Sequence, residues 1–254
     1  MSTPKLVKAD VPDDDVTNAP GSASTDARPV REAPPAPPSQ SWSQRKASLI
    51  GGVALLLLAV VAALANFGAV EAVVTPGDSA RTAQDLIASE GLFRWGVIGL
   101  MAVAILDIVV AYALMVVFEP VSRSVATLAA VFRVAYATVF VVAISQLVSA
   151  LSLLGDPDET MRAIGEFHTI WDAGYALFGI HLLLIGYLVY RSGFAPRIIG
   201  AMLVVAGLGY LVDKVGAVLV SGYALDVSRV SFVGEAVLIF WLLIKGIRRS
   251  PASI

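Results

Sequence analysis

Long apolar stretches, separated by short polar connections, dominate the chain after residue 46. About 20 apolar residues in a helix cross the hydrocarbon core of a bilayer, so each stretch predicts a membrane-spanning helix. The last stretch is the weakest, because Glu235 interrupts it and Lys245 closes it. The expected fold class is all-α, a polytopic membrane bundle within residues 44–249. Its six predicted spans are residues 47–69, 94–118, 125–150, 170–190, 198–220 and 230–247.

The first 43 residues follow a different pattern, with few apolar side chains to bury. They contain three successive aspartates at 13–15 and a proline-rich run at 34–38. Because so little burial cannot offset the conformational entropy of the chain, we expect a disordered tail over residues 1–43. The proline-rich run favours polyproline II and leaves two roles open, a solvated tether or a docking segment for a protein partner.

The outer connections carry helix signals of their own. In the sequence DPDE, Asp156 is placed to act as an N-cap, with Pro157 at the first helical position and Glu159 at the third. This is a capping-box pattern. Apolar residues then recur at helical spacing, which predicts a short amphipathic helix on the outer interface before the fourth span. We expect a similar helix from residues 79–89, before the second span.

Composition supports the membrane class. Hydrophobic residues make up 57% of the chain, charged residues 15%, and the mean hydropathy is +0.78. Soluble domains average about 45–50% apolar and about 25% charged residues. The net charge of −2 gives no basic surface, so the expected partner is the lipid bilayer and not nucleic acid. The absence of cysteine excludes disulfides, thiolate nucleophiles and cysteine-ligated metal centres.

Positive charge next to the spans predicts the orientation of the chain. By the positive-inside rule, the side richer in lysine and arginine faces the cytoplasm. On the opposite side, the few arginines are accompanied by many acidic residues. We therefore expect a plasma-membrane protein with both termini in the cytoplasm. The residues that define the cytoplasmic side are Arg45, Lys46, Arg123, Arg191, Arg197, Lys245, Arg248 and Arg249.

Two opposite charges fall inside the second and third predicted spans. Asp107 lies about 12 residues before Glu119, and Arg133 lies about 10 residues after Arg123. At about 1.5 Å per residue these spacings correspond to depths of about 18 and 15 Å. Both side chains are then near the midplane of a core about 30 Å thick, on neighbouring antiparallel helices. Because an unpaired charge there costs about 2.5–3.5 kcal/mol, we expect a buried ion pair, either for helix register or for function.

A second polar group is expected nearer the outer side of the membrane. Acidic and basic side chains from several spans reach a similar outer depth in the predicted topology. One interpretation is a water-filled outer pocket that holds a polar or ionic ligand. The other is a network of interfacial salt bridges without a ligand. The residues of this group are Arg94, His168, Asp172, Asp213, Lys214 and Glu235.

The two histidines limit the possible cofactors. His181 lies near mid-depth in the fourth span, and His168 is the only other histidine. The two are about 140° apart around the helix and about 20 Å apart along it, so they cannot ligate one haem. We expect neither a cofactor nor a metal site, and we interpret His181 as a hydrogen-bonding residue between helices. No motif of a soluble enzyme is present, and no enzyme activity is indicated.

Several stretches together resemble a known family. They are GLFRWG, LDIVVAYAL, AAVFRVAYA, FGIHLLLIGYLVYRSGFAPRIIGAMLVVAGLGYLVD and GEAVLIFWLLIKG, and they cover most of residues 45–247. The chain is similar in them to the bacterial multi-pass membrane family described as a domain of unknown function, numbered four-three-eight-six. The resemblance implies the fold and no activity. Tyr136 departs from the family pattern, which would have a carboxylate or an amide there. The polar positions that match are Arg94, Asp107, Arg133, His181, Asp213 and Glu235.

These observations leave two function classes open. The first is a small transporter or solute-binding membrane protein, in which the outer residues line a pocket and Asp107 and Arg133 form an internal gate. The alternative is a non-catalytic structural or sensory subunit, in which the buried charges only fix helix packing. The first predicts a hydrated outer pocket, whereas the second predicts that the polar residues affect stability alone.

Overall fold

A computed structural model describes residues 42–223 and 232–247, and every regular element in these two ranges is helical. The prediction of an all-α fold is therefore confirmed for the described residues. The predicted disordered tail, 1–43, lies outside them apart from its last two residues. Of these, Ser43 is the N-cap of the first helix, and its Oγ accepts a hydrogen bond from the backbone N–H of Lys46 at 3.3 Å.

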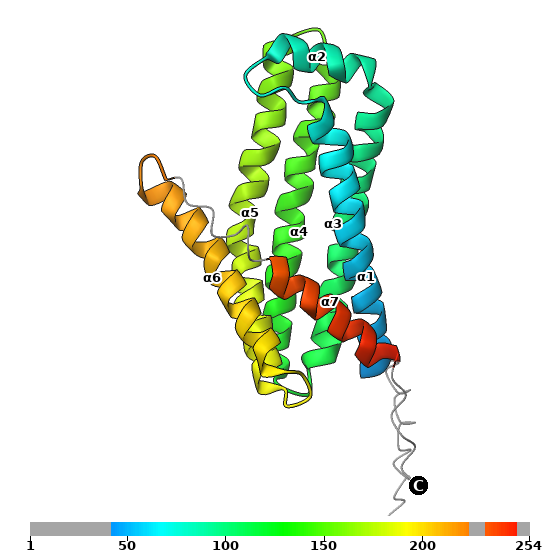
Figure 1. Cartoon of the computed structure of the whole chain (residues 1–254), viewed down its shortest axis with the longest axis vertical. Coiled ribbons are helices and arrows are strands. Elements are labelled where there is room, and N and C mark those ends of the chain that lie inside the picture. The colour runs from blue at the N-terminus through cyan, green and yellow to red at the C-terminus, as the bar shows by residue number, and fades with distance from the viewer. Residues whose placement is uncertain (1–41, 224–231, 248–254) are drawn as a thin grey trace, which may run out of the picture. The chain divides into compact units, whose positions relative to one another are not determined.

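Figure 1 shows the arrangement of the helices along the described chain. The first long helix continues without a break through one π-helical turn and one 3-10 turn. The elements are α1 (Gln44–Ala65), η1 (Asn66–Val70), η2 (Glu71–Val73), α2 (Ser79–Ala88), α3 (Glu90–Phe118), α4 (Arg123–Ser152), α5 (Pro157–Arg191), α6 (Arg197–Leu219) and α7 (Phe232–Ile247).

Five helical segments of the described chain are long and apolar enough to cross a membrane: α1 with its extension, α3, α4, α5 and α6. Apolar side chains face outward on them, such as Leu64 at 67% and Ile105 at 65% exposure. These features indicate a multi-pass membrane protein. A sixth span at 230–247 is not confirmed. The 16 residues of α7 correspond to about 24 Å, which is less than the thickness of the hydrocarbon core.

The predicted N-cap, Asp156, begins α5, whereas the side chain of Glu159 contacts Arg162 and does not complete a capping box. The Asp156 carboxylate accepts a hydrogen bond from the backbone N–H of Glu159 at 3.2 Å, and Pro157 occupies the first turn. The helix then continues for 35 residues to Arg191. The predicted amphipathic helix and the fourth span are thus one element, because no proline after Pro157 interrupts the backbone hydrogen bonds. At about 52 Å, α5 extends well beyond a hydrocarbon core about 30 Å thick.

The helix predicted at 79–89 is present as α2, which lies across one end of the long helices in Figure 1. The carboxylate of Asp78 accepts a hydrogen bond from the backbone N–H of Arg81 at 2.9 Å and caps the helix. Ser79 Oγ donates to Asp158 Oδ1 at 2.6 Å, which joins α2 to the start of α5.

The long helices pack in succession around a common interior: α1 contacts α3, α3 contacts α4, α4 contacts α5, and α5 contacts α6. The last helix, α7, crosses the others obliquely in Figure 1 and packs against both α1 and α6. The Arg45 guanidinium donates from Nε to the Gly246 carbonyl at 3.0 Å, so the start of α1 and the end of α7 lie at the same end of the bundle.

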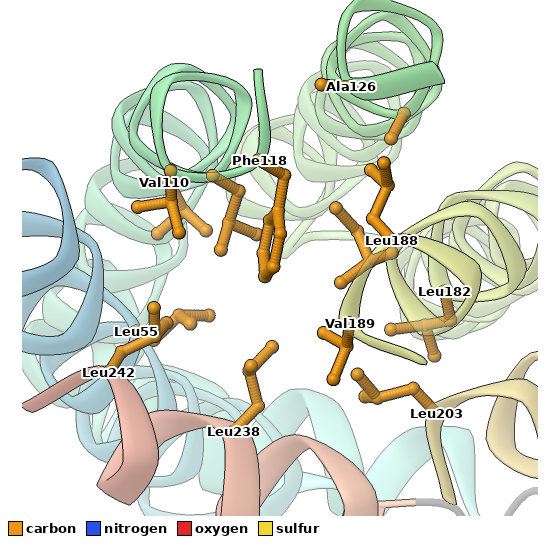
Figure 2. Packing of buried hydrophobic residues seen from close by; sticks show 14 of the residues in the cluster. Leu55, Val110, Phe118, Ala126, Leu182, Leu188, Val189, Leu203, Leu238 and Leu242 are labelled. Atoms are coloured by element: carbon orange, nitrogen blue, oxygen red, sulfur yellow. The ribbon is translucent and has the colours of Figure 1, made fainter. Parts of the chain in front are cut away.

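One apolar cluster fills the part of this interior near the start of α1. Figure 2 shows Leu55 of α1, Phe118 of α3, Val189 of α5 and Leu238 of α7 pointing toward one another. All four side chains are at most 6% exposed. This packing holds α7 in place against the other helices and therefore positions the residues in its first turns.

Glycines bring α5 and α6 into backbone contact. A Cβ atom at Gly200 would lie 2.7 Å from the Gly186 carbonyl oxygen, and one at Gly207 would lie 2.6 Å from the Gly179 carbonyl oxygen. Helices in membranes pack closely through such small residues. This contact fixes the aromatic residues of α5 and α6 with respect to each other.

Candidate functional site

Asp107 of α3 and Arg133 of α4 meet in the interior of the bundle. Arg133 Nη2 lies 2.6 Å from Asp107 Oδ1, and the two side chains are 4% and 3% exposed. The two residues lie on neighbouring antiparallel helices joined by a short turn, so their similar distances from that turn bring them to the same depth.

His181 of α5 extends this pair into a network of three helices. Arg133 Nη1 donates to His181 Nε2 at 3.2 Å, and His181 Nδ1 lies 2.9 Å from the Ala129 carbonyl oxygen. A guanidinium can only donate, so Nε2 must accept and the proton must be on Nδ1, which donates to Ala129. The imidazole is therefore neutral in this network, and it links α4 to α5 as a hydrogen-bonding residue.

The positive charge of Arg133 is surrounded on several sides. Besides Asp107 and His181, the ring of Phe178 lies 5.4 Å from the guanidinium carbon, within the range of a cation–π contact. The Nε atom of Arg133 is buried and has no hydrogen-bond acceptor among the residues that the structure describes. Most of the guanidinium is thus engaged within the protein.

A cavity of about 290 Å³ adjoins this network. Its wall combines residues from α1, α3, α4, α5, α6 and α7. Three charged side chains line it, Asp107, Arg133 and Glu235. Leu55, Leu58 and other aliphatic residues of α1 and α7 form the apolar part of the wall.

Five aromatic side chains form the remaining wall: Tyr136, Trp171, Tyr175, Phe178 and Tyr210. The rings of Tyr175 and Tyr210 are stacked at 5.1 Å with an interplanar angle of 7°, and those of Tyr136 and Phe178 are 4.9 Å apart. Trp171 Nε1 donates to Tyr136 Oη at 2.9 Å. The sequence prediction missed this aromatic wall. The only signal was the spacing of the three rings on α5, which lie at i, i+4 and i+7 on one helix face.

Glu235 reaches the cavity from the first turn of α7. Among residues 42–223 and 232–247, no basic side chain lies within ion-pair distance of its carboxylate. Two of the three ionisable lining residues are acids and one is a base, so the wall contains one acid more than it has bases. The two acids therefore differ, since only Asp107 has a cation in contact.

Lys214 and Asp172 of the predicted outer group meet each other outside this cavity. Lys214 Nζ lies 2.9 Å from Asp172 Oδ1 and 5.5 Å from the centre of the Tyr175 ring. The carboxylate of Asp213 accepts a hydrogen bond from Tyr223 Oη at 2.9 Å. These three predicted residues are not part of the cavity lining.

The other two members of the outer group contact different residues. His168 Nε2 lies 3.0 Å from Glu71 Oε1, and Arg94 Nη2 lies 2.6 Å from Glu90 Oε1. The structure thus places five of the six predicted pocket residues in contacts outside the cavity and brings only Glu235 to its wall. Over the described ranges, no three His, Cys, Asp or Glu side chains gather as a metal ion would require.

Comparison with known proteins identifies the family. A family model described as "Domain of unknown function (DUF4386)" matches residues 50–246, so the chain belongs to this family, as the resemblance predicts. A protein of Archaeoglobus fulgidus, described as "Uncharacterized protein", is 36% identical over 152 residues, which is 60% of this chain and 84% of the relative. No solved structure matches. Asp107, Arg133, His181 and Glu235 all lie within the family match.

Proposed function

We propose that this member of the DUF4386 family binds a small solute in the central cavity, as a transporter or solute-binding membrane protein. The observation that carries this proposal is the cavity of about 290 Å³ with three charged residues in its wall. Its size is close to the lower end of the range of ligand pockets, roughly 300–1,000 Å³. Charged side chains within membrane helices are energetically costly and commonly mark solute pathways.

The alternative, a structural or sensory subunit whose charges only fix helix packing, accounts for part of this arrangement. The network of Asp107, Arg133 and His181 satisfies its own charges and joins α3, α4 and α5. Glu235 does not contribute to such a network, and five aromatic rings face the same cavity. We propose that the network holds the wall of the cavity in position. Glu235 and the aromatic rings then contact the solute.

We also propose a plasma-membrane location with both termini in the cytoplasm. The contact between Arg45 and Gly246 supports this orientation, because it places the start of α1 and the end of α7 at the same end of the bundle. Basic residues flank the spans at that end, as the positive-inside rule requires of the cytoplasmic side.

Thermal unfolding of the full chain in lipid nanodiscs tests the proposed binding. Three water-soluble probes share a phenyl ring and differ in charge: benzyltrimethylammonium, phenylacetamide and phenylacetate. A bound solute stabilises the folded state by about 2.7 kcal/mol at about 100 times its Kd. We expect at least one of the three to raise the Tm, and the increase should depend on its concentration.

A matched pair of variants tests whether the increase in Tm arises from binding in the cavity. Ala62→Phe introduces a ring into the cavity wall and should abolish the increase in Tm. Leu64→Phe introduces the same ring two residues away, at a position 67% exposed on the same chain segment, and should leave the increase unchanged. If no probe changes the Tm, or if Ala62→Phe leaves the increase intact, the cavity is not a binding site for such solutes.

A further inference from the structure

We infer that the solute is a small organic cation, held between the carboxylate of Glu235 and the aromatic wall. This inference rests on the proposed binding function of the cavity and names the class of its ligand. It combines an unmatched negative charge, a set of aromatic rings and an apolar surface, all of which line one cavity.

The charged residues of the wall favour a cation. Asp107 and Arg133 are in direct contact and neutralise each other. Lys214, a second basic residue beside the aromatic wall, is paired with Asp172 at 2.9 Å. Within the described ranges no basic side chain lies within ion-pair distance of Glu235, so its carboxylate has no cation in contact. In an apolar environment such a carboxylate attracts a cation strongly.

The aromatic rings of the wall also favour a cation. The faces of such rings carry negative electrostatic potential, and rings that surround a substituted ammonium group form a known recognition arrangement. Two of the lining rings already have cations near them within the protein: Arg133 lies 5.4 Å from Phe178, and Lys214 lies 5.5 Å from Tyr175. Tyr136 and Tyr210 line the same wall.

The apolar part of the wall determines what kind of cation fits. Leu55, Leu58 and Ile239 line the cavity across α1 and α7. A metal ion requires several oxygen ligands, and only one carboxylate here is not already paired with a cation. An ammonium group that carries apolar or aromatic substituents matches both parts of the wall.

An anion is the principal competing ligand, because Arg133 lines the same cavity. Its guanidinium already contacts Asp107 and His181. An anion at this position would have to compete with the carboxylate of Asp107, while Glu235 would repel it. These contacts favour the cation, and the experiment includes the anion as a direct comparison.

Isothermal titration calorimetry with the three phenyl probes tests the ligand class, using the full chain in nanodiscs. We expect benzyltrimethylammonium to bind about tenfold more tightly than phenylacetamide, and phenylacetate to bind most weakly. Glu235→Gln should weaken binding of the cation by about tenfold and leave phenylacetamide within about twofold. Glu166→Gln changes a carboxylate that is 43% exposed on α5 and should have no effect.

A second pair of variants tests the aromatic wall independently of Glu235. Tyr210→Phe keeps the ring face and should retain binding of the cation, whereas Tyr210→Leu removes the face and should weaken it by about tenfold. This pair keeps the inference testable if Glu235→Gln does not yield folded protein.

The possible failures are distinguishable. Equal binding of all three probes would overturn the cation inference and leave the proposed binding function intact. Tightest binding of phenylacetate would also overturn it and would assign recognition to Arg133. If none of the three probes binds, both the proposed function and the ligand class are contradicted.

Discussion

Two carboxylates line the same cavity, and they differ in whether a basic side chain contacts them. Asp107 is 2.6 Å from Arg133, and the two side chains, one on each arm of a helix hairpin, are at most 4% exposed. Glu235 lies at the start of α7, and over the described ranges no basic side chain lies within ion-pair distance of it. Under the proposed function the two acids have different roles: the paired charge contributes to the helix arrangement, whereas the unpaired carboxylate contacts the ligand.

The matched substitutions Asp107→Asn and Glu235→Gln convert each acid to its amide, and the larger effect is expected at Asp107. Asp107→Asn leaves Arg133 as an uncompensated buried charge. Breaking a buried ion pair in this way destabilises a protein by about 3–5 kcal/mol. Equilibrium unfolding in mixed micelles of increasing SDS content should measure the loss.

A double variant provides the control for this prediction. Replacing both partners with apolar residues, Asp107→Leu together with Arg133→Met, removes both charges and should recover most of the lost stability. If Asp107→Asn alone unfolds like the unmodified protein, the ion pair does not stabilise the bundle.

His181 tests whether the network extends from the hairpin to α5. His181→Leu keeps a side chain of apolar bulk but removes the contacts with Arg133 and the Ala129 carbonyl. Because buried groups then lose their hydrogen-bond partners, we expect a loss of about 1–3 kcal/mol in the same unfolding measurement. His168→Leu, at the histidine whose side chain is 41% exposed, should change stability by less than about 0.5 kcal/mol. Equal losses at the two histidines would contradict the network.

The hairpin and its ion pair show what helix geometry allows the sequence to predict. The rise of a helix converts spacing in the chain into depth, and one short turn gives both arms a common reference. Asp107 and Arg133 could therefore be placed together from the sequence. The same reasoning predicts α2 and the capping of α5 by Asp156, because both depend on local contacts.

The position of Glu235 could not be predicted from spacing along the chain. Counting from the outer end of a full span gives it a shallow position in an outer pocket. The described helix α7 begins at Phe232 and crosses the bundle obliquely, as Figure 1 shows, so the depth of its residues does not follow from loop positions. The aromatic wall was missed for a related reason, since Tyr136 and Tyr210 come from different helices and only packing brings them together.

Glu235→Gln should have the smallest effect on stability, and this result would separate the two acids most clearly. The substitution removes a negative charge that has no ion-pair partner in the described residues, so no interaction of that kind is lost. We expect the free energy of unfolding to change by less than about 0.5 kcal/mol, or to increase, because the neutral amide is less costly to hold in an apolar wall. Unfolding in SDS micelles without added solute measures this directly. A loss as large as that of Asp107→Asn would show that Glu235 is a packing residue, and the distinction between the two carboxylates would then not hold.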